Sequence, residues 1–280
     1  GSIGYGHSGG KNINVSLNTS EYFGWSVSLS GNRLVVGTGY GDGYNNSRSN
    51  SGDVYLYTFS NSTFSGGALD AMLGYGYTGE KDVNQALDSS DYFGWGVSLD
   101  GDRLAVGARQ DDGYNNWYSG NSGAVYLYTF SDSVFSGGAL AARIGEGYTG
   151  GKNINQSLDG TDRFGMAVSL DGNSLAVGAP YGNGSSNSRP DSGDVYLYTF
   201  TDSVFSGGER DATIGYGYSG GNNVNNSALY TYDYFGASVS LDNNRLAAGA
   251  RAGDGYNSSS GNEGEVYIYS ISGGGDSISS

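Results

Sequence analysis

The sequence lacks several residue types on which common functional sites depend. It has no cysteine, so neither disulfides nor thiolate zinc sites hold the fold together, and its single histidine, His7, offers no Ser-His-Asp constellation. Its 13 basic residues stand against 28 acidic ones, and a formal net charge of -15 has the wrong sign for nucleic acid or an anionic membrane surface. We therefore expect no enzyme, no nucleic-acid partner and no required cofactor.

Long apolar runs are also missing, and proline is rare. No segment approaches the roughly 18 apolar residues that cross a membrane as a helix, so we expect no membrane insertion. Glycine, in contrast, occurs 52 times, and each glycine costs about 1 kcal/mol relative to alanine in a helix interior. Together with 25 tyrosines, this composition predicts short strands joined by turns and almost no α-helix.

A fourfold repeat is the main signal in the chain. Phe-Gly pairs open at Phe23, Phe93, Phe164 and Phe235, spaced 70, 71 and 71 residues apart. Each pair is followed by two strand-like runs around a short turn of Gly, Asn and Asp, as in WGVSLDGDRLAVG, which is typical of an antiparallel hairpin. A third run, VYLYTF or VYIYSI, and a fourth, such as ALDAMLGYG, complete a set of four strands.

Four antiparallel strands repeated radially are typical of the blades of a β-propeller. We predict a single all-β propeller domain over residues 1–280, with blades at about 22–76, 92–147, 163–217 and 234–271. The last repeat ends without its fourth strand, whereas the IGYG of residues 3–6 matches the missing segment. We therefore expect residues 1–6 to close the last blade, which would remove an open sheet edge. A longer array, or a larger ring made by two chains, is the alternative.

A family resemblance agrees with this fold. Fourteen residues after each Phe comes a Gly followed by a small residue: Gly37-Thr38, Gly107-Ala108, Gly178-Ala179-Pro180 and Gly249-Ala250. This pattern resembles the FG-GAP repeat of integrin α-subunit propellers and their bacterial relatives. The resemblance implies a propeller in a secreted or cell-surface protein, here as a monomeric domain of a larger one. Four copies replace the usual seven, and the integrin-type acidic calcium loop between the first two strands is absent, so calcium is not carried over to that place.

The connection between the second and third strands is the most variable part of the repeat, and loops on a rigid scaffold are where binding usually resides. Its polar and aromatic side chains are the candidate ligand-binding residues: Asp42, Tyr44, Asn45, Asp112, Tyr114, Asn115, Trp117, Asp254, Tyr256 and Asn257. The rings can stack on sugars while amides and carboxylates bond hydroxyl groups. Oxygen atoms beside a glycine turn also suggest calcium ligands: Asp42, Asp111, Asp112 and Asp254. Alternatively, these residues only build a surface turn.

These observations predict an extracellular or cell-surface binding or adhesion module whose partner is a glycan or a protein. Its repeated loops would present several weak copies of one site, which act together through avidity. The alternative is a structural spacer or assembly unit of a bacterial surface protein with no small ligand. A hydrolase is the least supported function, because nearly every Asp recurs at a turn in several copies, whereas a unique active site should break the repeat.

Overall fold

The four repeats fold as four small β-sheets, the blades of a four-bladed β-propeller. The computed structural model describes residues 1–116, 120–255, 261–271 and 278–279. Within this part of the chain the only helical segments are short 3-10 helices, at η1 (Tyr44–Asn46), η2 (Tyr114–Asn116) and η3 (Ser185–Asn187). None of the described helices is long and apolar enough to cross a membrane. The glycine-rich composition thus gives the predicted all-β fold.

The blades share one strand order, and each of the first three ends in an additional two-residue strand. Blade 1 consists of β3 (Ser26–Ser30), β4 (Arg33–Thr38), β5 (Asp53–Thr58), β6 (Ala68–Gly74) and β7 (Val83–Asn84). Blade 2 consists of β8 (Phe93–Asp100), β9 (Arg103–Ala108), β10 (Ala124–Thr129), β11 (Ala139–Gly145) and β12 (Ile154–Asn155). Blade 3 consists of β13 (Ala167–Asp171), β14 (Ser174–Ala179), β15 (Asp194–Thr199), β16 (Glu209–Gly215) and β17 (Val224–Asn225). Blade 4 consists of β18 (Phe235–Asp242), β19 (Arg245–Ala250), β20 (Glu265–Ile271) and β21 (Ile278–Ser279).

The hairpin between the first two strands of each blade forms as predicted, because its turn residues accept positive φ. Gly31, Gly101 and Gly172 have φ values of 60, 56 and 53°. In the last repeat Asn243 replaces this glycine, and it adopts a φ of 52°. Asparagine tolerates this region better than most residues with a Cβ, so all four turns keep one geometry.

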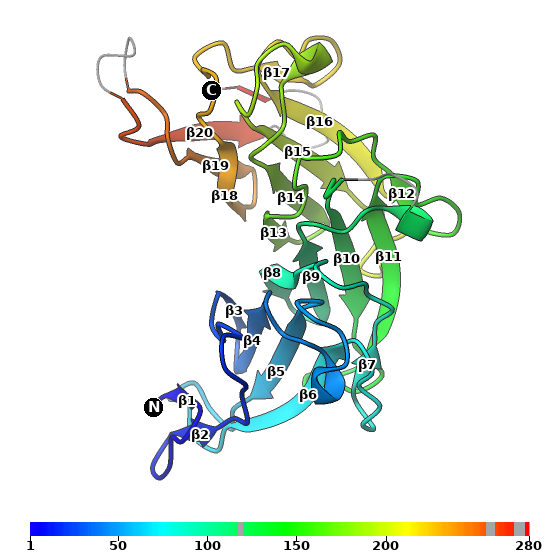
Figure 1. The fold of residues 1–280 in the computed structure, drawn as a ribbon, viewed down its shortest axis with the longest axis vertical. Helices are drawn as coiled ribbons and strands as arrows, with labels where there is room; N and C mark the ends of the chain where they lie inside the picture. The colour runs from blue at the N-terminus through cyan, green and yellow to red at the C-terminus, as the bar shows by residue number, and fades with distance from the viewer. Residues whose placement is uncertain (117–119, 256–260, 272–277, 280) are drawn as a thin grey trace.

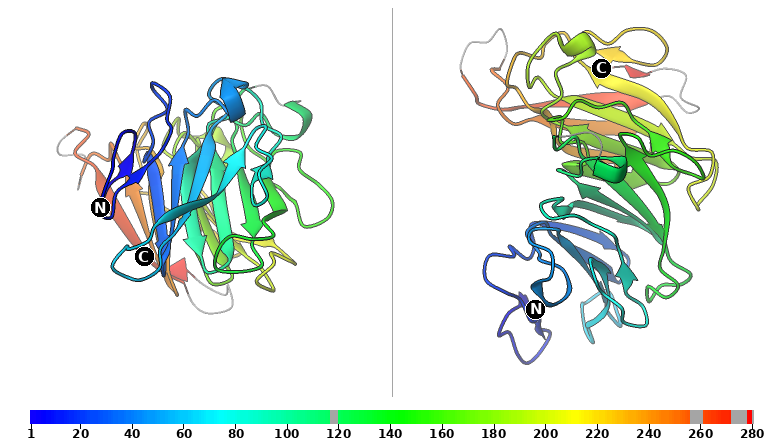
Figure 2. Two further views of the ribbon diagram at one scale, coloured as in Figure 1. Left: turned by 90° about the horizontal axis from the view of Figure 1, so that it is seen from below. Right: turned by 45° about the vertical axis from the view of Figure 1, so that its right-hand side comes forward.

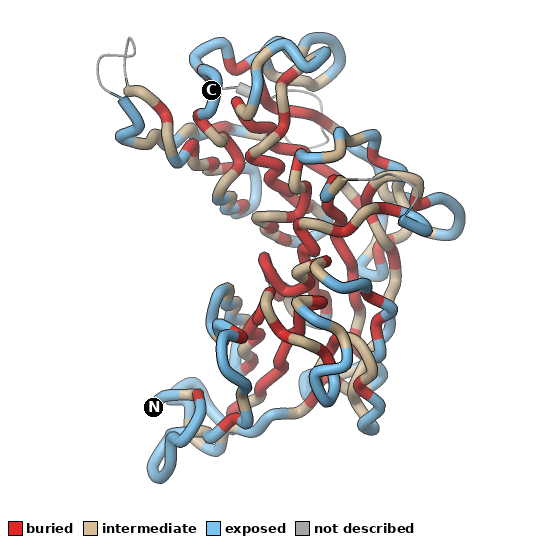
Figure 3. The backbone as a smooth tube through the Cα atoms, in the orientation of Figure 1, coloured by how far each residue is buried: buried red, intermediate tan, exposed pale blue. Residues whose placement is uncertain are grey.

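The blades follow one another along an arc, with blade 1 and blade 4 at its two ends (Figure 1, Figure 2). The apolar core lies between neighbouring blades: Val54 and Leu56 of blade 1, for example, belong to the same buried cluster as Phe93 and Val97 of blade 2. Burial is continuous through the middle of the arc and declines towards both ends (Figure 3). Each internal blade therefore contributes one face to the core before it and one to the core after it.

The Phe-Gly and Gly-Ala motifs meet wherever two blades touch. The second strand of one blade and the Phe-Gly glycine of the next approach so closely that an added Cβ would lie 1.8 to 2.0 Å from a backbone carbonyl oxygen. The three contacts are Gly37 on Gly94, Gly107 on Gly165, and Gly178 on Gly236. Only glycine fits at this distance, because real Cβ atoms do not come within 3.0 Å of such an oxygen.

A serine hydroxyl of each first strand also bonds to the next blade. It accepts a hydrogen bond of 2.9 Å from a leucine amide in all three contacts. The pairs are Leu99 N to Ser28 Oγ, Leu170 N to Ser98 Oγ, and Leu241 N to Ser169 Oγ. The step from one blade to the next is therefore the same three times.

The N-terminal residues do not complete the last blade, which corrects the expectation for residues 1–6. Strand β1 (Ile3–Gly4) pairs in parallel with β2 (Ile13–Asn14), just as residues 73–74 pair with residues 83–84 in blade 1. The last blade instead pairs β20 with β21 over two positions. Strand β1 cannot reach β20, because blade 1 and blade 4 lie at opposite ends of the arc (Figure 1).

Candidate functional site

The predicted loop residues that the structure describes lie at one end of the blades. Phe93, the first residue of β8, pairs with Ala108, the last residue of β9. The start of the first strand and the end of the second strand therefore lie at the same end of the blade, and the loop to the third strand begins there. We call this end, with residues 39–52, 109–116, 120–123, 180–193, 251–255 and 261–264, the loop face. The opposite end, which carries the hairpin turns, is the turn face.

The aspartates of these loops hold the loops together. Asp42 Oδ1 accepts a hydrogen bond of 2.8 Å from the amide of Asn50, and Asp112 Oδ1 accepts one of 2.7 Å from Asn121. Asp254 makes the matching bond in blade 4, with Asn262 at 3.0 Å. In blade 3 an amide oxygen takes the role, since Asn183 Oδ1 accepts from Asp191 N at 2.9 Å. The geometry supports the turn-building interpretation, with bonds that span the loop.

The neighbouring tyrosines and asparagines differ in what they offer a ligand. Tyr44 and Tyr114 are each 52% exposed, with ring edges against Tyr77 and Tyr148. Asn45 and Asn115 adopt left-handed φ values of 55° and 59°, a conformation that asparagine tolerates, so their identity follows from the turn. The remaining candidates of this set lie outside the described residues: Trp117, Tyr256 and Asn257.

Asp111, the other calcium candidate, is an interior residue. It is 4% exposed, and its carboxylate accepts hydrogen bonds from Tyr126 Oη at 2.5 Å, Tyr148 Oη at 3.1 Å and the Gly113 amide at 2.8 Å. Burial raises the pKa of Asp111 above its ordinary value. Among the described residues, no three His, Cys, Asp or Glu side chains gather as metal ligands. Calcium binding by these loops stays a prediction.

Two substitutions at Asp42 separate loop closure from calcium binding. We expect Asp42→Ala to reduce the free energy of unfolding by about 1 kcal/mol, because the Asn50 amide loses its acceptor. Asp42→Asn should be nearly neutral, since Asn183 already does the same work in blade 3. Thermal unfolding with calcium and with a chelator is the measurement. A melting temperature that rises with calcium in the parent chain and not in Asp42→Asn would contradict the structural role.

A second feature of the loop face is a row of stacked aromatic and arginine side chains, which we call the aromatic–arginine row. It consists of Tyr22, Trp25, Tyr40, Tyr92, Trp95, Arg109, Arg163, Tyr181, Tyr234 and Arg251. The rings of Tyr40 and Tyr92 lie 5.2 Å apart, and those of Trp25 and Trp95 lie 4.3 Å apart. The row crosses the contacts between all four blades.

Arginines stack on these rings. The Arg109 guanidinium carbon lies 3.7 Å from the centroid of a Trp95 ring, and that of Arg163 lies 4.1 Å from the Tyr181 ring. Arg251 lies 4.2 Å from the Tyr234 ring, and its guanidinium donates a hydrogen bond of 3.2 Å to the Tyr181 hydroxyl. Stacking of this kind holds a guanidinium in a fixed orientation while its N–H edges stay free to donate.

None of these arginines is in direct contact with a carboxylate in the described part of the chain. Within the described part of the chain, no ion pair is formed by Arg109, Arg163 or Arg251, although five other basic residues make one. Arg109 is 8% exposed, and its Nε atom has no hydrogen-bond partner. Burial and the charge of nearby Arg163 lower the pKa of Arg109. A buried unpaired guanidinium in a chain of net charge -15 suggests a site for an anionic group.

The repeat contained a signal for this row. The residue before each Phe-Gly pair is Tyr22, Tyr92, Arg163 or Tyr234. All four have positive φ, between 53 and 56°, which is unusual for such side chains and turns them towards the loop face. Arg109 and Arg251 follow the Gly-Ala pair directly. Comparing these aligned positions between repeats would have placed arginine next to tyrosine.

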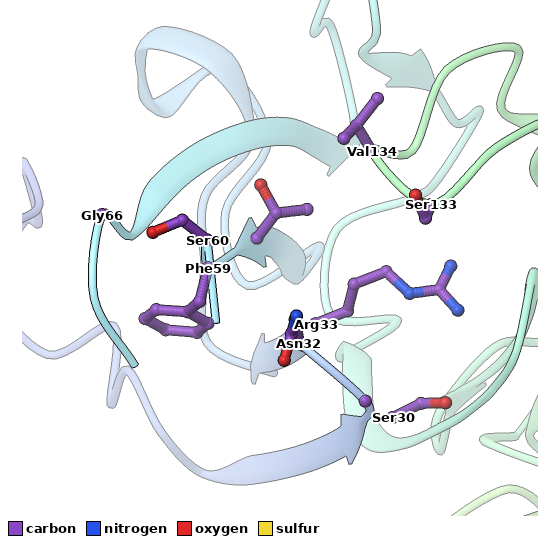
Figure 4. Close-up of a pocket in the computed structure, with 10 residues that line it drawn as sticks. Ser30, Asn32, Arg33, Phe59, Ser60, Gly66, Ser133 and Val134 are labelled. Atoms are coloured by element: carbon purple, nitrogen blue, oxygen red, sulfur yellow. The ribbon is translucent and has the colours of Figure 1, made fainter. Parts of the chain in front are cut away.

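The turn face carries a hollow of about 520 Å³ between blade 1 and blade 2 (Figure 4). Ser30, Arg33 and Phe59 line it from blade 1, and Val134 lines it from blade 2. Arg33 extends away from the Phe59 ring in Figure 4, and its Nη1 atom pairs with Asp102 at 2.8 Å. A smaller hollow of about 270 Å³ recurs at the next contact. The hollow thus recurs with the repeat. The charge of Arg33 is already balanced by Asp102.

Comparison with known proteins agrees with the repeat. The FG-GAP repeat model matches residues 17–57, 87–128, 158–198 and 222–269, which is more than half of the chain. The chain belongs to the FG-GAP repeat family. No curated protein matches it. Among solved structures, it is similar to a mutant GH32 β-fructofuranosidase of Bombyx mori in complex with sucrose, at 12% identity and a TM-score of 0.40, over 94% of this chain and 51% of that one. The chain spans about half the length of that protein.

Each of the first three blades also buries a carboxylate near the loop face, supplied from two different positions. In blades 1 and 3 it comes from the start of the third strand, at Asp53 and Asp194, which are 1% and 2% exposed. In blade 2 Ala124 stands at that position and Asp111, at the end of the preceding turn, provides the carboxylate. A Cβ added at Gly41, the counterpart of Asp111, would lie 2.2 Å from Asp53 Oδ2. Carboxylates from the Asp53 position and from the Asp111 position therefore occupy the same space in their blades.

A second acidic residue accompanies each of these carboxylates. It is Glu21, Asp91, Asp162 or Asp233 in blades 1 to 4, and all four are buried. Burial, together with the nearby charge of Asp162, raises the pKa of Asp194 to about 8, and burial raises the pKa of Asp162 to about 7. Because the arrangement recurs in blades 1 to 3, it belongs to the repeat.

Proposed function

We propose that this FG-GAP propeller is a non-catalytic binding module, exposed outside the cell, whose loop face holds a carboxylate-bearing glycan. The observation that carries the proposal is the aromatic–arginine row, with three arginines that have no carboxylate partner in the described part of the chain. An arginine fork matches a carboxylate with two parallel hydrogen bonds, and flat aromatic rings pack on the apolar face of a sugar.

The extent of the row supports a polymeric ligand. Tyr22 at the start of the row is 58% exposed, and Tyr40, Tyr181 and Tyr234 are partly exposed, so rings are accessible from blade 1 to blade 4. Each arginine and its ring would bind one acidic sugar weakly, and several such contacts along one chain add through effective concentration. The exposed Tyr44 and Tyr114 of the neighbouring loops extend the same surface outward.

A non-catalytic role is favoured by the way in which acidic residues are distributed. The buried carboxylates with raised pKa values recur in successive blades, and their partners are tyrosine hydroxyls and backbone amides of the same blade. The single histidine, His7, is exposed and lies in the N-terminal turn, away from the row. The proposal requires neither a cofactor nor calcium.

The test measures binding to acidic and neutral polysaccharides by calorimetry. We expect the chain to bind a polyuronate such as polygalacturonate and to show little affinity for a neutral polymer. Arg109→Gln and Arg163→Gln should each weaken polyuronate binding about tenfold or more, since a charged hydrogen bond contributes about 1.5–3 kcal/mol. Binding should also weaken as salt increases.

Arg245→Gln is the matched control, because Arg245 is an exposed arginine of the turn face that pairs with Asp242. This variant should bind the polyuronate as the parent chain does. Equal losses from Arg163→Gln and Arg245→Gln would show that net charge alone drives binding. Binding to none of the glycans, with capture of a protein through the same arginines, would reject the glycan and keep the loop face as a protein-binding surface.

A structural spacer or assembly unit is the second candidate. It is favoured by a different observation, the apolar side chains exposed at the two ends of the arc.

A further inference from the structure

The first strand of blade 1 exposes the apolar face that the same strand buries in blade 2. Trp25, Val27 and Leu29 are 47%, 61% and 55% exposed. Their counterparts in blade 2, Trp95, Val97 and Leu99, are 7%, 7% and 5% exposed. In blade 2 this face is covered by blade 1, and nothing in the described part of the chain covers it in blade 1.

The last blade exposes apolar side chains on its opposite face. Val266 and Ile268 of β20 are each 70% exposed. Their counterparts in blade 1, Val54 and Leu56, are fully buried because blade 2 packs on them. Blade 4 therefore exposes the face onto which a following blade packs, and blade 1 exposes the face that packs onto a preceding one.

Sequence features that serve a blade contact are retained at both free faces. Gly107 needs to be glycine because the next blade would clash with a Cβ, but the only atoms near an added Cβ at Gly249 are those of Ser238 within its own blade. The backbone of Gly249 is not left-handed either, so nothing within one copy requires glycine there. Ser240, the counterpart of the accepting serines Ser28, Ser98 and Ser169, is exposed with no donor from a following blade.

The strand edges are complementary as well. In blade 1, β5 pairs with β6 from Asp53 to Thr58, whereas β20 pairs with β21 only at Ser270 and Ile271. No described residue pairs with Glu265 or Val266 on this edge of β20. Strand β1 lacks a partner on its other side. Residues 73–74 of β6 pair with both β5 and β7, while their counterparts Ile3 and Gly4 in β1 pair with β2 alone among the described residues.

The N-terminal segment is already placed as the end of a preceding blade. Gly6 N donates to Asn14 Oδ1 at 2.7 Å, as Gly76 N donates to Asn84 Oδ1 at 2.8 Å. The Lys11 ammonium donates to a carbonyl in the loop after the third strand of blade 1, and Lys81 makes the same contact with blade 2. Ile3, Ile13 and Val15 belong to the apolar cluster of blade 1. This segment therefore presents an ordered strand at the end of the arc.

We propose that two copies of this chain join head to tail, with blade 4 of one packing on blade 1 of the other as consecutive blades do within a copy. Val266 and Ile268 cover Trp25, Val27 and Leu29 of the second copy. Its β1 extends the sheet of blade 4, with Ile3 opposite Val266 and Gly4 opposite Glu265, the register of residues 73–74 in blade 1. Gly249 meets the Gly24 carbonyl, and Ser240 accepts from the Leu29 amide.

The occupant is a second copy, because the two faces of one copy lie at opposite ends of the arc and remain exposed there (Figure 1). The contact is heterologous, so each copy uses both faces. Two copies close a ring of eight blades, within the range of about four to eight blades that propellers adopt. Each junction buries five apolar side chains that are otherwise exposed, which favours association through the hydrophobic effect.

The first test is the mass in solution, measured by light scattering on a sizing column with the full chain. We expect twice the 29.0 kDa of one chain. Val27→Asp and Val266→Asp should each give monomers that melt as cooperatively as the parent, because both residues are exposed in a single copy. Leu69→Asp, at an exposed apolar position on the outer strand β6, is the matched control and should leave the mass doubled.

Mixing the two monomeric variants tests the head-to-tail arrangement. The Val27→Asp chain keeps an intact blade 4 face and the Val266→Asp chain keeps an intact blade 1 face, so the mixture should form a one-to-one complex with a single junction. If like faces met, one of the two variants would still pair with itself when alone, and mixing would give no complex between the two variants. A parent chain that is monomeric at all concentrations would overturn the proposal.

Crosslinking tests the register and the occupant together. The chain has no cysteine, so Ile3→Cys combined with Val266→Cys creates the only thiols, at positions that we place directly opposite each other. Oxidation should give the mass of two chains on a non-reducing gel, and Ile3→Cys combined with Leu69→Cys should not. A bond formed within one chain, at the mass of the monomer, would show that the chain closes on itself and would reject the second copy.

Discussion

Replacing Gly107 by alanine is expected to lower the free energy of unfolding by about 3 kcal/mol or more, the largest loss we predict for one methyl group. The added Cβ would lie 1.8 Å from the Gly165 carbonyl oxygen, and this oxygen belongs to the backbone of the next blade. Relief requires blades 2 and 3 to separate, which would open the apolar core between them. Urea unfolding followed by circular dichroism gives the free energy.

The chain provides its own control for this substitution. Gly249 occupies the same repeat position, but its added Cβ would meet only the Ser238 side chain, whose hydroxyl can rotate away. In a Val266→Asp background, which leaves the blade 4 face free, Gly249→Ala should change the free energy of unfolding by less than about 1 kcal/mol. Equal losses at Gly107 and Gly249 would mean that alanine acts through the strand itself and not through the contact between blades.

The second large effect concerns pH. Burial raises the pKa of Asp53 and Asp162 to about 7, and that of Asp91 and Asp194 to about 8, from an ordinary value of 3.8. Between these limits the folded chain holds protons that the unfolded chain has released, so the stability they provide is complete at low pH and is lost as pH rises through about 7 to 8. We expect the melting temperature at pH 8.5 to be lower than at pH 5.5 by at least about 5 °C.

Asp194→Asn should remove part of this dependence. The amide keeps the shape of the protonated carboxyl group and has no charge to bury, so the variant should be more stable than the parent, by a larger margin at pH 8.5 than at pH 5.5. Asp132→Asn is the control, because backbone amides hold the pKa of that exposed carboxyl below its usual range and it does not titrate between these values. A melting temperature that rises with pH, or a slope unchanged by Asp194→Asn, would contradict the role of the buried carboxylates.

The elements of the fold could be predicted because their signals are local. The Asp-Gly and Asn-Asn turns define each hairpin within about fourteen residues of the Phe-Gly pair, and the alternation in residues such as Val97 and Leu99 identifies the buried face. The role of Gly37, Gly107 and Gly178 could not be seen in this way. It depends on a carbonyl of the following repeat, more than fifty residues away.

The closure of the last blade was predicted from the likeness of residues 3–6 to the fourth strand, and that likeness is real. What the sequence does not contain is the direction in which the blades turn from one to the next, which decides whether the two ends of one chain meet.

The aromatic–arginine row was missed for another reason. Its members Arg109, Arg163 and Tyr181 are far apart in the sequence, and each alone looks like an ordinary surface residue.

The exchange of the buried carboxylate between Asp53 and Asp111 limits how repeats can be recombined. A blade that receives the turn of blade 2 but keeps the third strand of blade 1 would hold two carboxylates in the space of one, and the reciprocal chimaera would leave tyrosine hydroxyls such as those of Tyr126 and Tyr148 without their acceptor. Shuffling between repeats is therefore tolerated only when the segment from the second strand to the third moves as a unit. The smallest segment that can be exchanged between repeats consists of the second strand, the third strand and the loop between them.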